Sequence, residues 1–356
     1  MMKILHTADI HLQETSEERW EALFEIIELG NREEVDILLI SGDLFDRDID
    51  ANKLRIKIRK LFSGNRYRIY ILPGNHDSKS FEGGSYLGEN AEVICSIEDV
   101  YEFGNVRIVG LPFMEISEGE IYSKLNYISS KLDSNKTNIL LYHGELLDSF
   151  YSRKDFGNED DKRYMPVKLD YFRDMNFDYI LAGHFHTTFN SIKYNSKKYF
   201  VYPGSPISIT RRETGKRGVN IFSTGEAPIE RYIDTPYYDI IKIELNPYDE
   251  LDPLSIIRER LCKIESNSKI LLTIKGYINC RDHGIDEKDL TQRIESLRCE
   301  MGNIVEAAYE YVDISRLLED NIYQSFNGKL NNMSLDESEK VVIRELFIRS
   351  MMEAGV

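Results

Sequence analysis

Five short apolar segments of this sequence each end in residues that can bind a metal ion. These endings are Asp9-Ile10-His11, Gly42-Asp43-Leu44-Phe45-Asp46, Asn75-His76-Asp77, His143-Gly144 and His184-Phe185-His186. They contain five of the seven histidines of the chain. Runs rich in Ile, Leu, Val and Tyr are typical of buried strands, and turns at strand ends carry many functional side chains. The sequence therefore predicts one site, built from the ends of several strands.

The order of apolar segments predicts a layered α/β domain in the first two-thirds of the chain. We expect strands at 3–7, 36–41, 68–72, 107–110, 138–142, 179–182 and 199–202. Helical patterns lie between several of them, and one begins with a capping box of Thr15 and Glu18 and closes at Gly30. Alternating strands and helices favour sheets whose outer faces are covered by helices.

A second structural unit is expected after the turn at Thr235-Pro236. A chain of 356 residues is longer than the ~250 to 300 residues at which a single core usually stops growing. Residues 237–312 alternate strand, helix, strand, helix, strand, and residues 313–356 predict helices, one of them capped by Ser334 and Glu337. We therefore expect a large domain at 1–236, a smaller α/β domain at 237–312 and C-terminal helices at 313–356.

The types of ligand favour two metal ions that share a carboxylate. Carboxylates, an amide and imidazoles suit divalent ions, and two such ions ~3.5 to 4 Å apart activate water for attack on phosphate esters. We assign one ion to Asp9, His11, Asp43 and His186, and the other to Asp43, Asn75, His143 and His184. Asp43 then bridges the pair.

Protonation of the leaving group needs a further residue beside the metal ions. His76 is our candidate, because an imidazole can hold a proton near neutral pH. We expect the side chain of Asp46 to accept a hydrogen bond from His76, and Asp77 to bind main-chain amides of its own turn. His6 lies within the first expected strand, so a hydrogen-bonded core histidine is the better interpretation there.

These motifs resemble those of the calcineurin-like metallophosphoesterase superfamily over about residues 1–225. Together with Tyr202-Pro203-Gly204-Ser205-Pro206, they are similar to the SbcD branch of DNA repair nucleases, bacterial relatives of the Mre nuclease. The resemblance implies a four-layer αββα phosphoesterase domain with a smaller capping domain. It also implies a manganese-dependent nuclease, with Mg²⁺, Fe²⁺ and Zn²⁺ as alternative ions, that cuts phosphodiester bonds at DNA ends. An SMC-like ATPase of the SbcC type would bind its C-terminal helices, and a homodimer is a further expected assembly.

The charge of the chain limits how it can bind DNA. A net charge of -16 excludes a generally basic surface, so DNA must be recruited by divalent cations, a local basic patch or a partner subunit. Arg211, Arg212, Lys216 and Arg217 place four cations within seven residues. Near the metal ions this loop could grip phosphates; alternatively, it is a solvated turn whose charges pair with Glu213 and other acids.

Two other segments each allow two interpretations. The loop at 147–166 contains Phe150, Tyr151, Phe156 and Tyr164, which could stack on unpaired bases or pack against the second domain. The helices at 313–356 could present an apolar stripe to a partner or cover the second domain. No apolar run approaches the length of a membrane span, and a strand at Lys3 leaves no room for a signal peptide, so we expect no membrane partner and a cytoplasmic location.

Two other functions stay open at this point. A phosphodiesterase or phosphatase acting on small nucleotides would need the same metal ligands but no basic loop. A non-catalytic adaptor could keep the fold as a binding scaffold, although the complete set of ligands argues against it.

Overall fold

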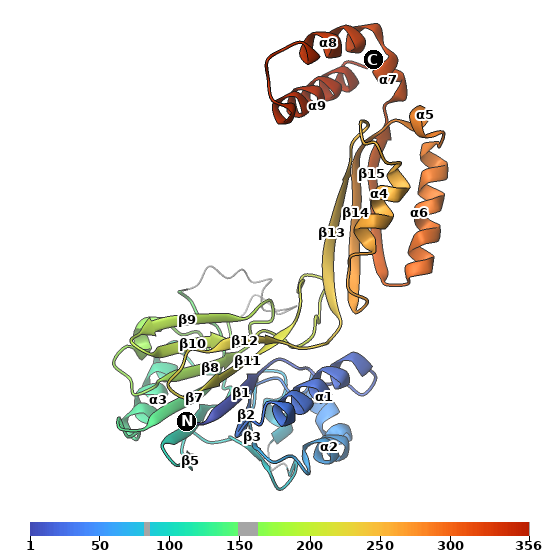
Figure 1. Ribbon diagram of the computed structural model, residues 1–356. Helices are drawn as coiled ribbons and strands as arrows, with labels where there is room; N and C mark the ends of the chain where they lie inside the picture. The colour runs from blue at the N-terminus through green and yellow to red at the C-terminus, as the bar shows by residue number, and fades with distance from the viewer. Residues whose placement is uncertain (82–85, 149–162, 356) are drawn as a thin grey trace. The chain divides into compact units, whose positions relative to one another are not determined.

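The computed structural model describes residues 1–81, 86–148 and 163–355 (Figure 1). The chain divides into two compact units, Met1–Tyr238 and Asp239–Val356. The boundary after Tyr238 lies close to the one expected at 236. The C-terminal helices, which we expected to form a separate part, belong to the same unit as the smaller α/β domain.

The first unit is built from two sheets and the helices that pack on them. Its described strands are β1 (Lys3–Thr7), β2 (Ile37–Ser41), β3 (Arg68–Leu72), β4 (Ala91–Val93), β5 (Tyr101–Phe103), β6 (Val106–Leu111), β7 (Thr137–His143), β8 (Tyr179–Gly183), β9 (Asn190–Asn195), β10 (Lys198–Tyr202), β11 (Gly218–Ser223) and β12 (Ile229–Tyr232). Its helices are α1 (Glu17–Arg32), α2 (Asp48–Phe62) and α3 (Glu118–Ser130). Short 3₁₀ helices lie at Ser78–Phe81 and Leu169–Phe172.

Each sheet has six strands in the described residues. The first has the order β12-β11-β1-β2-β3-β4 and the second β5-β6-β7-β8-β10-β9. Strands β1, β2 and β3 are parallel, and so are β6, β7 and β8. Because the carboxyl ends of parallel strands meet at one edge, the turns after these strands gather there.

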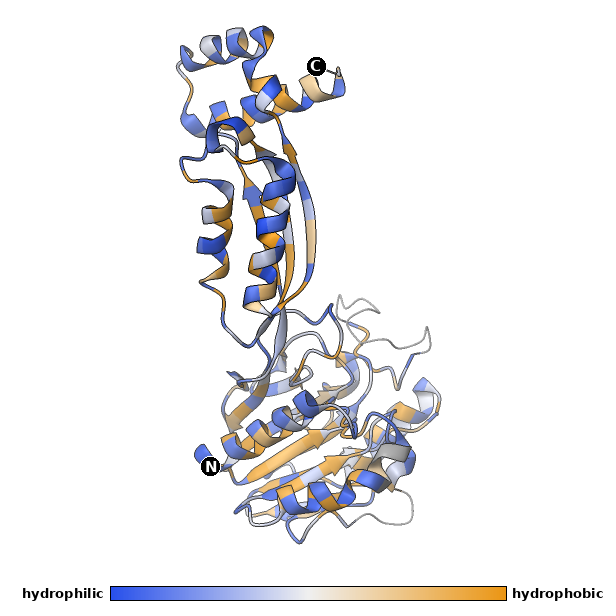
Figure 2. Ribbon diagram, turned by 90° about the vertical axis from the view of Figure 1, so that its right-hand side faces the viewer, coloured by the Kyte–Doolittle hydropathy of each residue, from blue (hydrophilic) through white to orange (hydrophobic). Residues whose placement is uncertain are grey.

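Alternating side chains place this unit's apolar core in three layers. In β2, Leu38 and Ile40 join the cluster that holds the apolar faces of α1 and α2. Leu39 points the other way and joins the cluster between the two sheets with Leu141 of β7. Helix α3 contributes Leu125 to a third cluster on the outer face of the second sheet. Strands buried on both faces read as continuous apolar runs, and Figure 2 shows them as the most hydrophobic part of this unit. The expected four-layer αββα arrangement is confirmed.

Helix α1 corrects two of our predictions. Its N-cap is Ser16 instead of Thr15, and no side-chain capping bond is made there. Gly30 does not close the helix, which continues to Arg32. A Cβ atom at Gly30 would lie 2.9 Å from the ring of Tyr67, whose hydroxyl donates to the carbonyl of Ile27. Gly30 therefore permits a close contact between α1 and the segment before β3.

The second unit contains a three-stranded sheet with order β13-β14-β15. Its elements are β13 (Tyr237–Leu245), which begins at the end of the first unit, α4 (Pro253–Leu261), β14 (Ser268–Ile278), α5 (Cys280–His283), α6 (Glu287–Met301), β15 (Ile304–Asp313), α7 (Ser315–Glu319), α8 (Asn321–Asn331) and α9 (Glu337–Glu353). Helices α4 and α6 bury Ile257 and Ile294 with Leu272 of β14. Among the described residues, no helix is long and apolar enough to cross a membrane.

The C-terminal helices differ from the sequence-based prediction in two places. One amphipathic helix is predicted by Ile314, Leu317, Leu318 and Ile322, but it is broken at Asp320, whose side chain caps the start of α8. The capping box of α9 is formed by Asp336 and Glu339, two residues after the pair that we expected. Asp320 and Asp336 form these caps because a short carboxylate accepts main-chain N–H groups readily at a helix start. Its charge also interacts favourably with the helix dipole.

Candidate metal centre

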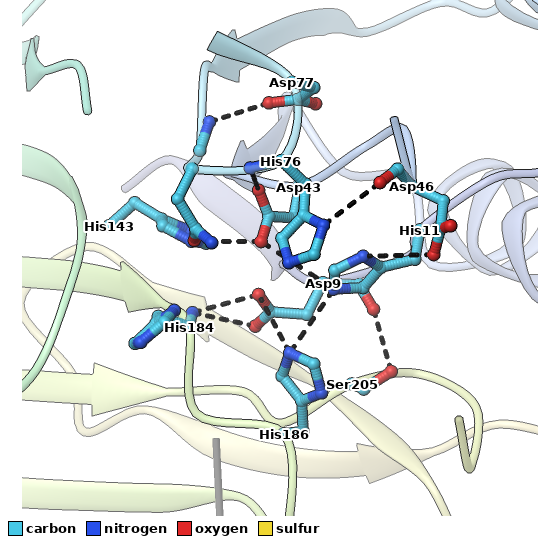
Figure 3. A network of polar contacts seen from close by, with 12 residues as sticks. Asp9, His11, Asp43, Asp46, His76, Asp77, His143, His184, His186 and Ser205 are labelled. Carbon is cyan, nitrogen blue, oxygen red and sulfur yellow. Dashed lines mark hydrogen bonds and ion pairs between the residues drawn. The ribbon is translucent and has the colours of Figure 1, made fainter. Parts of the chain in front are cut away.

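All five predicted segments meet where the parallel strands of the first unit end, at their carboxyl ends (Figure 3). Asp9 and His11 follow β1, Asp43 follows β2, Asn75 and His76 follow β3, His143 ends β7, and His184 and His186 follow β8. Asp9, Asp43, His143 and His184 are at most 1% exposed, and His11 and His186 at most 4%. The sequence predicted that these residues lie close together, and their positions at the strand ends bring them together.

One group of ligand atoms is formed by Asp9, His11 and His186, whose nearest atoms lie within 4.8 Å of one another. Nε2 of His11 lies 3.3 Å from Nε2 of His186 and 3.7 Å from Oδ2 of Asp43. Nε2 of His186 lies 3.7 Å from Oδ1 of Asp9. Two carboxylates and two imidazole nitrogens therefore face a common point.

A second group contains Asp43, His143 and His184. Nε2 of His143 lies 3.2 Å from Oδ2 of Asp43 and 2.9 Å from Oδ1 of Asn75. The main-chain N–H of His184 donates to both carboxylate oxygens of Asp9 at 3.0 Å, which ties the two groups together. Asp43 borders both groups, as expected of a bridging ligand.

This donor set fits two divalent cations. Oδ2 of Asp43 is buried and has no hydrogen-bond partner within the described part of the chain, although the Nε2 atoms of His143 and His11 lie close to it. His11, His143 and His186 all turn Nε2 inward, and each has an oxygen acceptor near Nδ1. The hydrogen bond fixes this tautomer for His143, and the nearby carboxylates favour it for His11 and His186, with Nε2 left as the metal ligand. Such carboxylate, amide and imidazole donors suit Mn²⁺, Fe²⁺, Zn²⁺ or Mg²⁺.

The backbone at this centre is strained. Among the described residues, seven other than glycine have positive φ, and four of them are candidate ligands: Asp9 at 55°, His11 at 50°, Asp43 at 52° and His184 at 91°. This region is costly for residues with a Cβ atom, and such strain is concentrated at functional sites. Gly42 and Gly74 allow the close approach, because added Cβ atoms would lie 1.9 Å from Nδ1 of His143 and 2.1 Å from Oδ1 of Asp43.

Burial and mutual attraction set the charges of this centre. Burial raises the pKa of Asp9 to about 6, although the imidazoles of His186 and His143 act against it. Burial alone would also raise the pKa of Asp43, but His143 and other imidazoles outweigh it and hold that pKa well below its ordinary value. Asp43 is therefore anionic at neutral pH, as a bridging ligand must be.

The structure changes our interpretation of Asp46. Nδ1 of His76 lies 3.0 Å from the main-chain carbonyl of Asp46, so the carbonyl makes the contact that we expected of the side chain. The Asp46 carboxylate accepts hydrogen bonds from Arg19 at 2.8 Å and Gln13 at 2.7 Å, and it lies 3.6 Å from Nδ1 of His11. Arg19, which we had not considered, draws the carboxylate away because a cation attracts it more strongly than a neutral ring does.

Two other expected contacts are confirmed. Asp77 accepts the main-chain N–H of Gly74, in its own turn, at 2.8 Å, as expected, and also that of Phe45, in the turn after β2, at 3.1 Å. His6 is fully buried and its Nε2 lies 3.0 Å from the hydroxyl of Ser41, as expected of a core histidine. Burial lowers the pKa of His6 to about 3, so the ring is neutral.

The basic loop contains two buried residues with unexpected roles. Glu213 is 0% exposed, and its Oε1 lies 3.6 Å from Nδ1 of His186, so it does not act as a surface partner for the neighbouring cations. Arg217 is 3% exposed and donates to the main-chain carbonyls of Ser205, Thr187 and His186. Our assignment of Arg217 to the substrate is therefore wrong, because its guanidinium is already engaged in the interior. Arg211, Arg212 and Lys216 are exposed.

We predict that Arg217→Met destabilises the first unit by about 3 kcal/mol, because buried carbonyls lose their charged donor. Arg212→Met on the same loop should change the free energy of unfolding by less than about 0.5 kcal/mol, since its side chain is exposed. Guanidinium chloride unfolding, with a chelator present in every sample, measures both. Equal stability of the two variants would contradict the interior role of Arg217.

Part of the expected aromatic loop also lies at the centre. Phe150, Tyr151 and Phe156 lie outside the described residues. The ring centroid of Tyr164 lies 5.1 Å from that of His184 and 5.9 Å from that of Phe113. Tyr164 thus packs beside a candidate metal ligand within the first unit.

Comparisons with known proteins give one family and several relatives. A family model described as calcineurin-like phosphoesterase matches residues 2–188. The chain is 24% identical over 383 residues to the SbcD subunit of nuclease SbcCD from Staphylococcus epidermidis, covering 97% of this chain and 98% of that protein. It is similar to the solved structure of TT1561 of Thermus thermophilus, with 13% identity, a TM-score of 0.42, and coverage of 61% of this chain and 93% of that one. A dimetal phosphatase from Danio rerio gives 11% identity and a TM-score of 0.42, with coverage of 62% and 91%.

Proposed function

Because the chain belongs to the calcineurin-like phosphoesterase family, whose fold implies a dimetal centre, we propose that it is a two-metal-dependent DNA nuclease of the SbcD type. The observation that carries this proposal is the convergence of Asp9, His11, Asp43, Asn75, His143, His184 and His186 on one buried centre with His76 beside it. Mn²⁺ is the ion that we favour.

The residues of the centre have separate roles in hydrolysis. When bound, two divalent cations acidify water and neutralise charge on the phosphate group. Asp43 joins the two groups of ligands, while its Oδ1 accepts the main-chain N–H of His76 at 2.9 Å. The main-chain carbonyl of Ser41 accepts from Nδ1 of His143 at 2.8 Å and so keeps Nε2 directed at the centre. These contacts hold the ligands in place before substrate arrives.

His76 is suited to deliver a proton to the leaving oxygen. Its Nδ1 faces the Asp46 carbonyl, so this nitrogen carries the proton in the neutral ring and Nε2 is left for exchange. Its ring is partly exposed, unlike the histidine and aspartate candidate ligands, and lies edge-on to His11 at a centroid distance of 4.7 Å. A partly exposed imidazole beside a metal centre can take a proton from solvent and pass it to a departing sugar oxygen.

DNA as the substrate is supported by the relative and by the basic loop. The staphylococcal nuclease subunit aligns with almost the whole chain. Arg211, Arg212 and Lys216 are exposed on the loop that also carries Glu213, which lies against His186. We propose that these three cations bind the phosphates that flank the cleaved bond. A short basic segment can do this in a chain whose net charge is -16.

We further propose that α8 and α9 bind an SMC-like ATPase of the SbcC type. The two helices pack through Phe326 and Phe347, whose stacked rings lie 3.7 Å apart. Ile322, Met333, Val342 and Leu346 on or between them are 53% to 60% exposed. Exposed apolar groups of this kind suit a protein partner, and the relative is named as one subunit of a complex. A homodimer and a cytoplasmic location stay predictions.

The experiment that tests the proposal uses the purified full chain with Mn²⁺ and linear double-stranded DNA. We expect DNA degradation that a chelator stops and that added Mn²⁺ restores. Parallel reactions with cyclic nucleotides and dinucleotides test the alternative. Turnover of these small substrates without cleavage of DNA, alone or with the ATPase subunit, would contradict the nuclease and favour a small-nucleotide phosphodiesterase. A metal-free, inactive protein would favour the adaptor.

A further inference from the structure

The two candidate metal positions differ in what lies behind their histidines. At the position of Asp9, Asp43, His11 and His186, both imidazoles have a carboxylate near Nδ1. Oε1 of Glu213 lies 3.6 Å from Nδ1 of His186, and Oδ1 of Asp46 lies 3.6 Å from Nδ1 of His11. The first position therefore has acidic groups both among its ligands and behind them.

At the second position the acceptor behind His143 is neutral, and the nearby buried carboxyl of Asp77 is engaged by main-chain N–H groups. Nδ1 of His143 donates to the main-chain carbonyl of Ser41 at 2.8 Å, and the neutral amide of Asn75 takes the place that Asp9 has in the first group. Ser41 is itself fixed, because its hydroxyl donates to the carbonyl of Leu181 at 2.8 Å. With Asp43 shared, the first position has two carboxylate ligands and the second has one.

Glu213 contributes more to this difference than Asp46 does. Arg19 lies 2.8 Å from the Asp46 carboxylate and offsets its charge. Glu213 instead accepts from neutral donors, the main-chain N–H of Ile209 at 2.7 Å and the hydroxyl of Thr210 at 3.0 Å. Burial raises the pKa of Glu213, but His186 and, more weakly, Arg217 hold it below its ordinary value. The Arg217 guanidinium is itself hydrogen-bonded to main-chain carbonyls. The Glu213 carboxylate thus stays available to the proton on Nδ1 of His186.

We propose that the two positions bind metal with unequal affinity, that the position of Asp9, His11, Asp43 and His186 fills first, and that Glu213 is the positioning residue that strengthens it. A carboxylate behind an imidazole orients the ring and makes it a better ligand. A second anionic ligand adds attraction that is strong where water is excluded. This inference rests on the proposed two-metal centre but not on DNA as the substrate. The free metal concentration would then control activity through the second, weaker position.

The test is a Mn²⁺ titration of the metal-free full chain, monitored by calorimetry and by electron paramagnetic resonance of Mn²⁺. Wild type should bind two ions in separate steps, and one equivalent should give isolated Mn²⁺ centres with no coupled pairs. Glu213→Gln should weaken the first step about 10- to 100-fold. Asn75→Ala should leave the first step intact and remove the second. Glu226→Gln, an exposed acid between β11 and β12, should change neither.

Glu213→Gln keeps an oxygen that can accept from Ile209, and circular dichroism of the metal-free variant checks that the fold is retained. If it does not fold, wild type and Asn75→Ala still decide the order of filling. Equal steps in wild type, or loss of the tighter step in Asn75→Ala, would overturn the proposal, as would an unchanged first step in a folded Glu213→Gln. If the chain binds two Mn²⁺ ions with unequal affinity but does not cleave DNA, the nuclease proposal is refuted and this inference stands.

Discussion

Asp43→Asn is expected to lose Mn²⁺-dependent cleavage by at least about 10³-fold, because the change removes the negative charge shared by both metal positions. Oδ2 of Asp43 lies 3.2 Å from His143 and 3.7 Å from His11, so one side chain borders both groups of ligands. Asparagine keeps the shape of the residue and tolerates the positive φ of 52° at this position. It also retains an oxygen that can accept the N–H of His76. The fold should therefore survive the substitution.

Metal binding and cleavage are measured together on this variant. We expect both steps of a Mn²⁺ titration to weaken, whereas Asn75→Ala affects one. The matched control is Asp174→Asn, which removes the same charge from an exposed position of the first unit. A variant that binds two ions and cuts at the wild-type rate would show that Asp43 does not bridge them, and the assignment of the centre would fail with it.

The convergence of the candidate ligands could be predicted from the sequence because each position depends on local information. An apolar run predicts a strand, and parallel strands bring their carboxyl ends to one edge, so polar residues such as Asp9 and Asp43 must meet. The seven strands expected for the first unit agree with the structure to within one residue at each end. The strands that we missed include β4, β5, β9 and β12, which form the four sheet edges. These edge strands are partly exposed, so they lack a continuous apolar run.

The residues that support the ligands could not be predicted in the same way. Glu213, Arg217 and Arg19 look like ordinary surface charges, and each has a partner that lies 27 to 31 residues away in the sequence. Only packing shows that Glu213 and Arg217 are buried while Arg211 and Arg212 are exposed. For Arg217 one signal exists, because it directly precedes β11, as a polar residue at a strand end. For Glu213 we find none.

His76→Gln is expected to lower kcat for DNA by about 10²- to 10⁴-fold, the usual contribution of a general acid, while two Mn²⁺ ions still bind. Nδ1 of His76 faces the Asp46 carbonyl, and glutamine can keep a donor there but cannot deliver a proton from Nε2. Metal titration is informative here, because His76 also lies in a group with His11 and Asp43 that could hold a cation. Loss of an ion in this variant would make His76 a ligand instead of an acid.

A substrate with a different leaving group further distinguishes a general-acid role of His76 from a role as a metal ligand. A nucleoside 5′-phosphate ester of p-nitrophenol releases an anion that is stable without a proton, so an enzyme that lacks its general acid should cleave it almost normally. We therefore expect His76→Gln to be impaired strongly on DNA and only slightly on this ester, while Asp43→Asn is impaired on both. An equal loss on the two substrates would mean that His76 positions the phosphate or the metal ions. Comparison of kcat on the two substrates thus tests the proton at Nε2 of His76, because kcat at saturating substrate does not depend on DNA affinity, whereas lost metal or misfolding would lower both rates alike.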